Sequence, residues 1–427
     1  MYLSSVFEEY FMIPRVKGTQ DYIKMDLYNL IIEKIKIELA LYNFTEIATP
    51  IIEPVSLFIR SLGEHTDVVS KEMFIIQSRN EEKEQICLRP EMTASTMRAF
   101  LQNNITQFPW HVFSHGPLFR YERPQKGRYR QFHQVNIESI GTDSISYDIQ
   151  LILLLDRFFH ERLAINNYVL QLNFLGCTTD RERYHNELYT FVKQQGPTSL
   201  CNTCITRAQT NLLRIFDCKQ EACQTVYNVA PKITDHLCND CQSDWEQLQN
   251  SLHMLSVSYI CNPKLVRGLD YYNKTVFEFI SNALGAQNAF CGGGRYNQLA
   301  TQLGAKQDIP AIGAALGIER VILLLEQQQT ATDQRSFSVI IPFGPAQHAL
   351  ALLLADELHA GNICVDAFFD GTMKQKMRQA NAQGAAYVLL IGEDEQNENK
   401  VTVKNLQTGD QEKIDIIRVK EYLEKVK

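Results

Sequence analysis

Residues 119–134 read Phe119-Arg120-Tyr121-Glu122-Arg123-Pro124-Gln125-Lys126-Gly127-Arg128-Tyr129-Arg130-Gln131-Phe132-His133-Gln134. The central part of this stretch, from its first to its last arginine, holds five cationic residues and one anionic residue, in a chain whose net charge is −7. Side chains alternate over 118–122 and again over 132–140, which predicts two strands, and Pro124 with Gly127 marks a turn between them. We therefore expect a β-hairpin with a basic tip, whose strands hold polar side chains rigidly enough for a ligand site.

The charge run in this hairpin has two interpretations. A solvated surface hairpin can carry such a run, whereas a site for a polyanion would use it, because a local excess of cations in an acidic chain is unfavourable without a partner. The overall acidity argues against a nonspecific DNA-binding protein but does not exclude a local patch that binds RNA.

The composition is that of an ordinary globular protein. The chain has 427 residues, of which 45% are hydrophobic and 21% charged, and this length predicts two or three domains. It contains no apolar run of the roughly 18 residues that a membrane helix needs. The N-terminus carries Glu8 and Glu9 and does not resemble a signal peptide. We therefore expect a cytoplasmic protein whose eleven cysteines are mostly reduced thiols.

The rest of the pattern predicts a large first domain over 1–330, with a polar, cysteine-rich helical insertion at about 178–255. Residues 326–334 have the composition of a linker. After it, strands and helices alternate, which predicts a small α/β domain over 336–427 with parallel strand pairing. The main expected helices are Asp26–Tyr42, Thr93–Gln102, Ser146–Leu163, Ile312–Leu325, Pro345–His359 and Met373–Gln383. The expected strands are Ile86–Leu88, Leu170–Leu175, Val276–Ile280, Phe337–Pro342, Ile363–Phe368 and Tyr387–Ile391.

Four further motifs accompany the hairpin. They are Leu88-Arg89-Pro90-Glu91-Met92-Thr93, Arg267-Gly268-Leu269-Asp270-Tyr271-Tyr272, Gly292-Gly293-Gly294-Arg295-Tyr296, and Gly313-Ala314-Ala315-Leu316-Gly317-Ile318-Glu319-Arg320. Together with the hairpin, in this order and spacing, they resemble the motifs of class II aminoacyl-tRNA synthetases, in the form found in the histidyl-tRNA synthetase family. The resemblance extends over nearly the whole chain.

This resemblance implies an α+β catalytic domain with an antiparallel class II sheet, a helical insertion and a C-terminal α/β anticodon-binding domain. It implies a histidine–tRNA ligase that forms histidyl-adenylate from L-histidine and ATP with Mg²⁺, and then transfers the histidyl group to tRNA(His). The helix Asp26–Tyr42 and the extended segment after it would form the interface of a homodimer, although periodicity alone equally suits an ordinary core helix.

The residues expected to act on ATP are mainly arginines, because transfer at a phosphate depends on alignment and charge stabilisation. By resemblance, Arg120 binds the α-phosphate and the histidine carboxylate, and Arg267 faces it from the opposite side as the second catalytic residue. Glu122 and Arg128 would hold the adenine and γ-phosphate ends of ATP.

Arg320 has a separate argument from the pattern. Gly313, Gly317 and Arg320 would share one face of the expected helix Ile312–Leu325, so that the glycines allow close approach to a sheet and the arginine points along it. A helix-packing pair with a surface arginine is the alternative. The resemblance implies that Arg320 binds ATP.

The histidine pocket needs acceptors for the imidazole N–H and for the ammonium group. Gln134 and Glu138 share a strand face and lie four residues, or roughly 13 Å, apart, so they can contact different parts of one ligand. A buried glutamate without a partner is unfavourable, which favours a ligand role for Glu138. Tyr296 is a weaker candidate, for which simple packing is the alternative. The remaining expected members of the pocket are Glu91, Thr93, Arg120, Arg267, Tyr271 and Tyr272.

Two further predictions concern tRNA and metal. By resemblance, Arg123, Gln125 and Arg130 lie where the hairpin meets the acceptor end of tRNA. The two Cys-x-x-Cys pairs match a tetrahedral zinc pattern, although the 33 residues between them exceed the usual spacing, and free thiols are the alternative. The expected zinc ligands are Cys201, Cys204, Cys238 and Cys241.

A rival interpretation is a synthetase-like regulatory subunit of histidine biosynthesis, which shares the catalytic fold without aminoacylating. That relative is expected to lack the C-terminal domain and to have degraded motifs. The chain departs from the family pattern at Met92, where glycine is usual, and at Asn297-Gln298, where Asp-Gly is common. These departures affect the expected local geometry.

Overall fold

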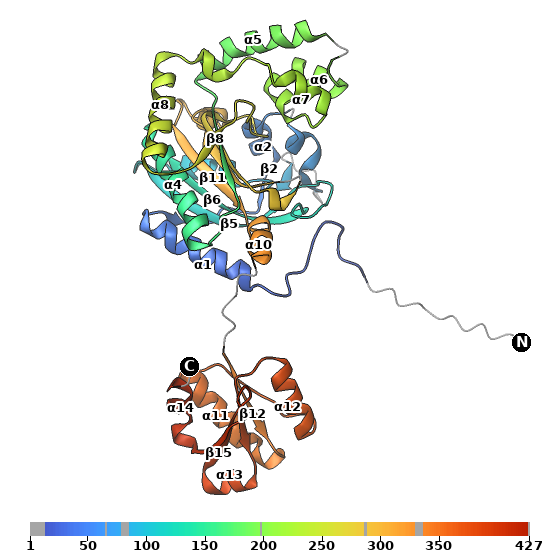
Figure 1. Cartoon of the computed structure of the whole chain (residues 1–427), viewed down its shortest axis with the longest axis vertical. Helices are drawn as coiled ribbons and strands as arrows, with labels where there is room; N and C mark the ends of the chain where they lie inside the picture. The colour runs from blue at the N-terminus through green and yellow to red at the C-terminus, as the bar shows by residue number, and fades with distance from the viewer. Residues whose placement is uncertain are drawn as a thin grey trace, which may run out of the picture. The chain divides into compact units, whose positions relative to one another are not determined.

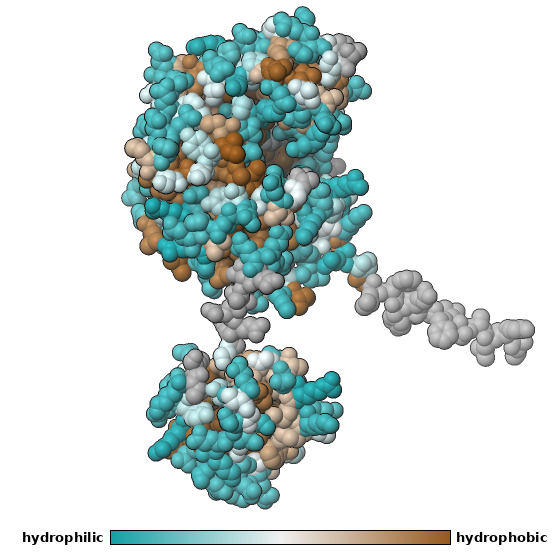
Figure 2. Space-filling view, viewed as in Figure 1, coloured by the Kyte–Doolittle hydropathy of each residue, from teal (hydrophilic) through white to brown (hydrophobic). Residues whose placement is uncertain are grey.

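The computed structural model describes residues 13–64, 66–77, 85–196, 199–285, 288–328 and 336–425. The chain divides into two compact units, Met1–Thr330 and Ala331–Lys427. Figure 1 shows the fold of each unit, and Figure 2 shows that the visible surface of each is mostly hydrophilic. Within the described residues, no helix is long and apolar enough to cross a membrane.

The first unit is built on an eight-stranded sheet with the order β1-β5-β6-β11-β10-β9-β7-β8. In this order, each pair of adjacent strands in the segment β5-β6-β11-β10-β9-β7 is antiparallel. The short edge strands β1 and β8 pair parallel with their neighbours. The expected antiparallel catalytic sheet is confirmed. The strands are β1 Thr45–Glu46, β5 Trp110–Phe119, β6 Gln131–Ile140, β7 Val169–Phe174, β8 Tyr259–Cys261, β9 Asn273–Ile280, β10 Ala289–Arg295 and β11 Ala311–Gly317.

Helices and a small sheet cover this large sheet (Figure 1). The helices α1 (Asp26–Leu41), α4 (Ser146–Arg157) and α10 (Ile318–Gln327) enclose an aromatic core in which the ring centroids of Phe159 and Phe290 lie 4.8 Å apart. A second core lies under α2 (Val55–Leu62), α3 (Thr93–Gln102) and the three-stranded sheet β2-β4-β3. The strands of that sheet are Ile52–Pro54, Ile86–Leu88 and Phe74–Ile76 in the order β2, β4, β3.

One predicted helix is wrong. The segment Ile312–Leu325 contains the strand β11 and then the helix α10, which begins at Ile318. The cause is that 311–317 is a continuous run of small and apolar residues, and such a run fits a buried strand and a helix equally well. Gly313 and Gly317 therefore lie on the strand, and only Arg320 lies on the helix.

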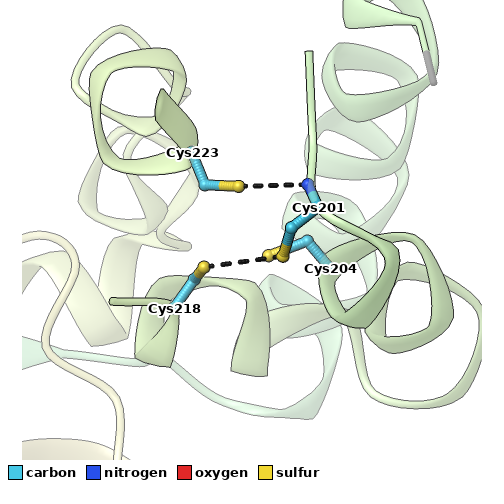
Figure 3. A group of neighbouring side chains, drawn as sticks. All are labelled: Cys201, Cys204, Cys218 and Cys223. Atoms are coloured by element: carbon cyan, nitrogen blue, oxygen red, sulfur yellow. Dashed lines mark hydrogen bonds between the residues drawn. The ribbon is translucent and has the colours of Figure 1, made fainter. Parts of the chain in front are cut away.

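The insertion is helical, as expected. It contains α5 (Thr178–Gln195), α6 (Asn202–Thr210), α7 (Glu221–Tyr227) and α8 (Asn239–Met254), with 3₁₀ turns at Leu212–Asp217 and Ile233–His236. The predicted zinc ligand set is wrong, because the two Cys-x-x-Cys pairs belong to separate clusters. One cluster is Cys201, Cys204, Cys218 and Cys223 (Figure 3), and the other is Cys177, Asp180, Cys238 and Cys241.

The second unit has a five-stranded sheet with the order β13-β12-β14-β15-β16. The expected parallel pairing holds for β12 (Ser338–Pro342) with β13 (Val365–Ala367) and β14 (Tyr387–Ile391). The chain then adds an antiparallel hairpin, β15 (Lys400–Asn405) and β16 (Gln411–Asp415), which the sequence analysis did not predict. The helices are α11 His348–Ala360, α12 Met373–Ala382, α13 Glu393–Glu398 and α14 Val419–Lys425.

Candidate active site

The basic hairpin forms as expected, with strands β5 and β6 paired from Phe119 with Gln131 back to Trp110 with Ile140. Beyond the strands, the N–H of Arg120 donates to the carbonyl of Arg130 at 2.9 Å. The tip closes through Gln125 and Arg128, each of whose N–H groups donates to the other's carbonyl. Gly127 in this turn has φ +72°, which favours glycine. Strand β5 ends at Phe119, so the side chain of Arg120 extends from the end of this strand.

Arg120 and Arg128 lie on either side of Glu122. Arg128 forms an ion pair with the Glu122 carboxylate, and the NH1 of Arg120 lies 3.9 Å from the other carboxylate oxygen. The Nε of Arg120 donates to the carbonyl of Pro90 at 3.0 Å, and its guanidinium lies 5.5 Å from the ring centroid of Phe132. These contacts hold Arg120 in place while leaving its side chain 21% exposed.

Arg320 joins this group from the first turn of α10. Its Nε donates to the carbonyl of Gly127 at 3.1 Å, and its NH1 donates to the carbonyl of Ala289. Burial, together with the positive charges of Arg128 and Arg120, lowers the pKa of Arg320 to about 10. At neutral pH it stays protonated, so three guanidinium groups face one region that favours an anion.

The neighbour of Arg320, Glu319, fixes the start of the helix. Its carboxylate accepts from the backbone N–H of His133 at 2.8 Å and from the hydroxyl of Tyr22 at 2.6 Å. The His133 ring nitrogen Nδ1 also lies 2.9 Å from it. Because His133 is on β6, these contacts tie α10 to the strand that carries Gln134 and Glu138, and so set the position of Arg320.

Arg267 approaches from the segment before β9. It forms an ion pair with Glu278 on that strand, and its guanidinium lies 5.6 Å from the ring centroid of Tyr272. A Cβ added at Gly292 would lie 2.5 Å from the NH1 of Arg267, so the glycine on β10 makes room for the guanidinium. Burial lowers the pKa of Arg120, and the charge of Arg267 lowers it as well.

Glu138 is the centre of a buried polar group on β6. Its carboxylate accepts from the hydroxyl of Thr93 at 2.7 Å and from the hydroxyl of Tyr296, and the amide of Asn136 lies 3.5 Å away. Burial, together with the charge of Glu91, raises the pKa of Glu138 to about 8. The side chain is 1% exposed.

Glu91 serves mainly the helix beside this group. Its carboxylate accepts from the backbone N–H groups of Thr93 at 2.7 Å and Ala94 at 2.8 Å, which satisfies two free donors at the start of α3. Tyr271 packs against two other aromatic rings near Glu138. Its ring centroid lies 4.6 Å from that of Tyr272 and 5.6 Å from that of Tyr296.

Gln134 lies four residues before Glu138 on the same strand. It pairs with Gly116 on β5 and with Gly317 on β11. Because both neighbours across the sheet lack side chains, longer side chains from elsewhere reach the spaces beside Gln134, Arg89 over Gly116 and Arg320 over Gly317. This is a role for Gly317 that the helical interpretation of the segment missed.

Several buried side-chain polar atoms have no hydrogen-bond partner among the described residues, and two of them are considered for the candidate site. They are the Nε of Arg267 and the Oδ1 of Asn136. Buried polar groups are paired in the great majority of cases, and each exception needs an explanation, of which a bound ligand is one. The unpaired donor of Arg267 and the unpaired acceptor of Asn136 are therefore candidates for contact with a ligand.

Three residues expected at the tRNA acceptor end differ in exposure. Arg123 and Gln125 are exposed on the hairpin. Arg130 instead lies with its guanidinium 3.7 Å from the ring centroid of Tyr121, and its Nε donates to the carbonyl of Glu122 at 3.3 Å. Arg130 thus stabilises the hairpin itself.

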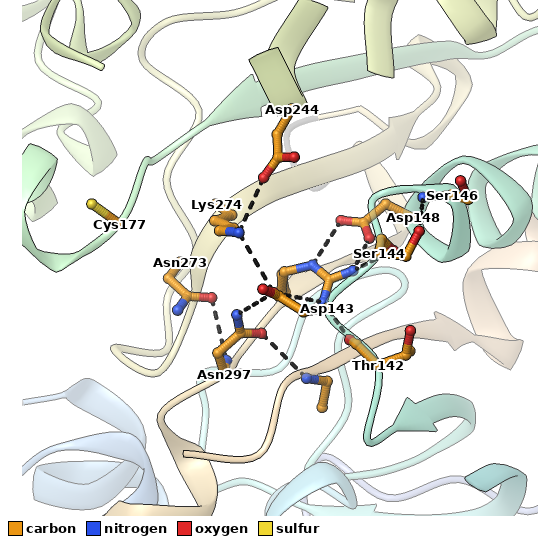
Figure 4. Close-up of polar contacts among 12 residues, drawn as sticks. Thr142, Asp143, Ser144, Ser146, Asp148, Cys177, Asp244, Asn273, Lys274 and Asn297 are labelled. Atoms are coloured by element: carbon orange, nitrogen blue, oxygen red, sulfur yellow. Dashed lines mark hydrogen bonds and ion pairs between the residues drawn. The ribbon is translucent and has the colours of Figure 1, made fainter. Parts of the chain in front are cut away.

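A buried ion pair holds the end of β10 (Figure 4). Arg295 pairs with Asp148 of α4 and donates to the carbonyls of Thr142 at 2.7 Å and Ser144 at 3.0 Å. Both charged side chains are fully buried, and this pairing satisfies them. The adjacent Tyr296 is thereby held where its hydroxyl reaches Glu138.

The two departures from the family pattern have local explanations. Met92 is buried with φ −111°, a conformation that does not require glycine, and its sulfur accepts from the hydroxyl of Ser114 at 3.3 Å. The amide of Asn297 donates to Asp143 at 3.2 Å, and its oxygen accepts from the N–H of Ala311 at 3.2 Å.

The sequence analysis missed two members of the candidate site, because Glu278 pairs with Arg267 and Asn136 lies beside Glu138. Tyr296, which was a weaker candidate, bonds to Glu138. Strand alternation on β6 could have indicated Asn136, since it shares a face with Gln134 and Glu138. The partners on other strands carry no such signal.

Comparisons with known proteins agree with this arrangement. The family described as Histidyl-tRNA synthetase matches residues 31–321, and the family described as Anticodon binding domain matches residues 338–426. The histidine–tRNA ligase of Aquifex aeolicus (strain VF5) is 40% identical over 410 residues, which cover 94% of this chain and 98% of the relative. The histidine–tRNA ligase of Acinetobacter baumannii (strain AYE) is 40% identical over 395 residues, which cover 90% of this chain and 91% of the relative. The crystal structure of apo S. aureus histidyl-tRNA synthetase matches with TM-score 0.79 and 30% identity, covering 96% of this chain and 99% of that one.

Proposed function

Since this chain belongs to the histidyl-tRNA synthetase family, we infer that it is a histidine–tRNA ligase, which joins L-histidine to tRNA(His) with ATP through a histidyl-adenylate. The observation that carries this conclusion is that one hairpin connects two features. One is the group of arginines Arg120, Arg128 and Arg320 around its tip, and the other is the buried acceptor Glu138 farther along β6.

We propose that Glu138 accepts a hydrogen bond from the imidazole of histidine. Support comes from its burial, from the donors Thr93 and Tyr296 that orient its carboxylate, and from the unpaired Oδ1 of Asn136 beside it. Tyr271 would form an aromatic wall of the pocket. Gln134, which is partly exposed and lies between two glycines, is suited to the ammonium end of the ligand.

Glu91 stays a weaker candidate for the ammonium group. Its carboxylate already accepts two backbone N–H groups of α3. Each carboxylate oxygen has a further lone pair, so a contact with the ligand is chemically compatible with the helix contacts. We propose that Thr93 acts through Glu138, whose carboxylate it orients.

We propose that Arg120 and Arg267 act on the reacting atoms. The planar guanidinium of Arg120 can hold the histidine carboxylate and the α-phosphate together. Arg267, whose buried Nε has no partner, would stabilise the charge that develops on the α-phosphate as the carboxylate attacks and pyrophosphate leaves. Both roles depend on the alignment of the guanidinium groups with the reacting atoms. The ion pair with Glu278 holds Arg267, and the hydrogen bond to the carbonyl of Pro90 holds Arg120.

The other contacts with ATP follow from the arginine group. We propose that Arg320 and Arg128 bind the outer phosphates and that Glu122 faces the adenine end. Mg²⁺ would enter with the phosphates, which supply most of its oxygen ligands together with water. Glu122 and Glu278, which are both paired with arginines, would contribute to that ion only if those pairs open.

The partners are proposed on the same basis. Arg123 and Gln125, exposed at the hairpin tip, are suited to contact the acceptor end of tRNA, and the second unit is suited to the anticodon. A homodimer through α1 is supported by the exposure of Ile37 (65%) and Leu41 (68%) on that helix. The cytoplasmic location remains a prediction.

The competing function is a regulatory subunit without ligase activity. A feature expected to be absent from it, the anticodon-binding domain, is matched in this chain over 338–426. The test is histidine-dependent exchange of pyrophosphate into ATP, measured with each of the amino acids in turn. Exchange with histidine alone is expected, and the absence of exchange by the folded protein would favour the regulatory function.

A further inference from the structure

Four cysteines converge inside the helical insertion (Figure 3). Cys201 immediately precedes α6 and Cys204 lies in its first turn, while Cys218 follows the 3₁₀ turn Leu212–Asp217 and Cys223 lies on α7. Their four sulfur atoms all lie within 4.8 Å of one another, and the sulfurs of Cys201 and Cys218 are 3.8 Å apart. Three of the four side chains are buried.

The spacing of these sulfurs is that of a tetrahedron around one ion. A tetrahedral zinc with Zn–S bonds of about 2.3 Å places its sulfurs about 3.8 Å apart. A disulfide needs sulfurs about 2.05 Å apart, which the described pair does not approach. A cluster of several irons would hold its four thiolates farther apart than one ion does. The geometry points to a mononuclear site, and we propose that Cys201, Cys204, Cys218 and Cys223 bind a structural Zn²⁺.

The surroundings of the sulfurs favour thiolates. The backbone N–H of Cys201 donates to the sulfur of Cys223 at 3.2 Å, and the N–H of Gln220 donates to that of Cys218 at 3.4 Å. Such N–H donors orient thiolate ligands and stabilise their charge. Binding of zinc by these thiols would displace their protons.

The second cluster, Cys177, Asp180, Cys238 and Cys241, has a different explanation. The carboxylate of Asp180 accepts from the N–H of Cys177 at 3.2 Å and from that of Cys238 at 2.8 Å. These two cysteines precede α5 and α8, so Asp180 satisfies donors at the start of both helices. Helix capping accounts for this convergence, whereas it does not account for four thiols around one point.

The zinc would fix a segment that reaches the catalytic motif. Residues 205–217 lie between the second and third ligands. Within them, the amide of Asn211 donates to Asp270 at 2.8 Å, and the guanidinium of Arg214 pairs with Asp67 at 2.9 Å. Asp270 belongs to the motif that contains Arg267. The ion would therefore hold the insertion against that motif. This proposal does not rest on the ligase function.

The experiment measures metal in the full-length protein, purified with a reductant and without chelators. Metal content by mass spectrometry is compared among the wild type, Cys218→Ser and Cys364→Ser. Cys364 is an exposed cysteine of the second unit and serves as the control. We expect Cys218→Ser to contain about one zinc fewer per chain than either of the others, as one tetrahedral site implies.

Two further measurements keep the proposal testable if Cys218→Ser does not fold. First, removing zinc from the wild type with a chelator should lower its Tm, and adding zinc back should restore it. Second, Co²⁺ added to the metal-free wild type should give the charge-transfer absorption of a four-thiolate tetrahedral site, and Cys238→Ser should keep this absorption. A wild type without zinc, iron in place of zinc, disulfides among the four thiols, an unchanged zinc content in Cys218→Ser, or loss of the cobalt absorption in Cys238→Ser would each overturn it.

Discussion

Replacing Gly313 by alanine is the sharpest test of the proposed histidine pocket. Gly313 on β11 pairs with Glu138 on β6. A Cβ at this position would lie 1.6 Å from the Oε2 of Glu138 and 2.8 Å from the carbonyl oxygen of Ile137. No heavy atoms approach that closely, so the carboxylate must turn away or the two strands must move apart. Gly313→Ala therefore displaces the acceptor while keeping its chemical identity.

The magnitude follows from two effects. Overpacking in a filled core typically lowers the free energy of unfolding by about 1–3 kcal/mol. Displacing the carboxylate removes the charged hydrogen bond proposed for the imidazole, which is worth about 1.5–3 kcal/mol. Since about 1.4 kcal/mol corresponds to a factor of ten, kcat/KM for histidine should fall by about tenfold to about a hundredfold. The KM for ATP should change little, because the arginine group is separate.

The assay is pyrophosphate exchange with histidine varied at saturating ATP, followed by ATP varied at saturating histidine, with thermal unfolding measured in parallel. Ile140→Val is the matched control. It removes one buried methyl group from β6, two residues beyond Glu138, and should lower stability by about 0.5–1.5 kcal/mol without moving the carboxylate. A folded Gly313→Ala protein with wild-type kcat/KM for histidine would refute the reasoning. An equal loss in Ile140→Val would assign the effect to stability alone.

The remaining predictions test the same site by charge. Glu138→Gln should lower kcat/KM for histidine at least about tenfold, since the amide offers one acceptor oxygen where Thr93 and Tyr296 both donate; unchanged histidine-dependent exchange would place Glu138 outside the pocket. The raised pKa of Glu138, about 8 against an ordinary 4.5, means that its contribution to folding is present below the ordinary pKa and is lost as the pH rises through about 8. Denaturant unfolding from pH 5 to pH 9 should therefore show a steeper loss of stability in the wild type than in Glu138→Gln, and parallel curves would contradict the shifted pKa. Arg267→Lys should bind histidine and ATP but form adenylate on the order of a hundredfold more slowly in a single turnover, and a wild-type rate would remove Arg267 from the mechanism.

The sequence predicted those parts of the fold whose signal is local. The hairpin at residues 119–134 combines strand alternation with a Pro and Gly turn, and both signals act within a few residues. The helix Thr93–Gln102 and the strand Tyr387–Ile391 have the predicted bounds. The resemblance supplied the order of the motifs, and with it the antiparallel sheet and the anticodon-binding unit.

The wrong predictions arose where a local sequence pattern is compatible with two different structures. Residues 311–317 are small and apolar throughout, so only their pairing with β6 and β10 decides between strand and helix. The cysteine pairs are another case, because spacing along the chain does not say which pairs meet in space. The contacts of Tyr296 with Glu138 and of Glu278 with Arg267 join different strands, and no periodicity reports them.

The end of the insertion has a consequence for engineering this protein. Trp245, Leu248 and Leu252 of α8 are buried in the same core as β7 and β9, and Lys274 at the start of β9 pairs with Asp244 of this helix. A shortened protein that connected β7 directly to β8 would lose the helix along with the insertion and leave one end of the sheet uncovered. A minimal version must therefore remove residues only within 178–238 and keep α8. The boundary of the removable part thus lies inside the segment 178–255, which the sequence analysis predicted as one insertion.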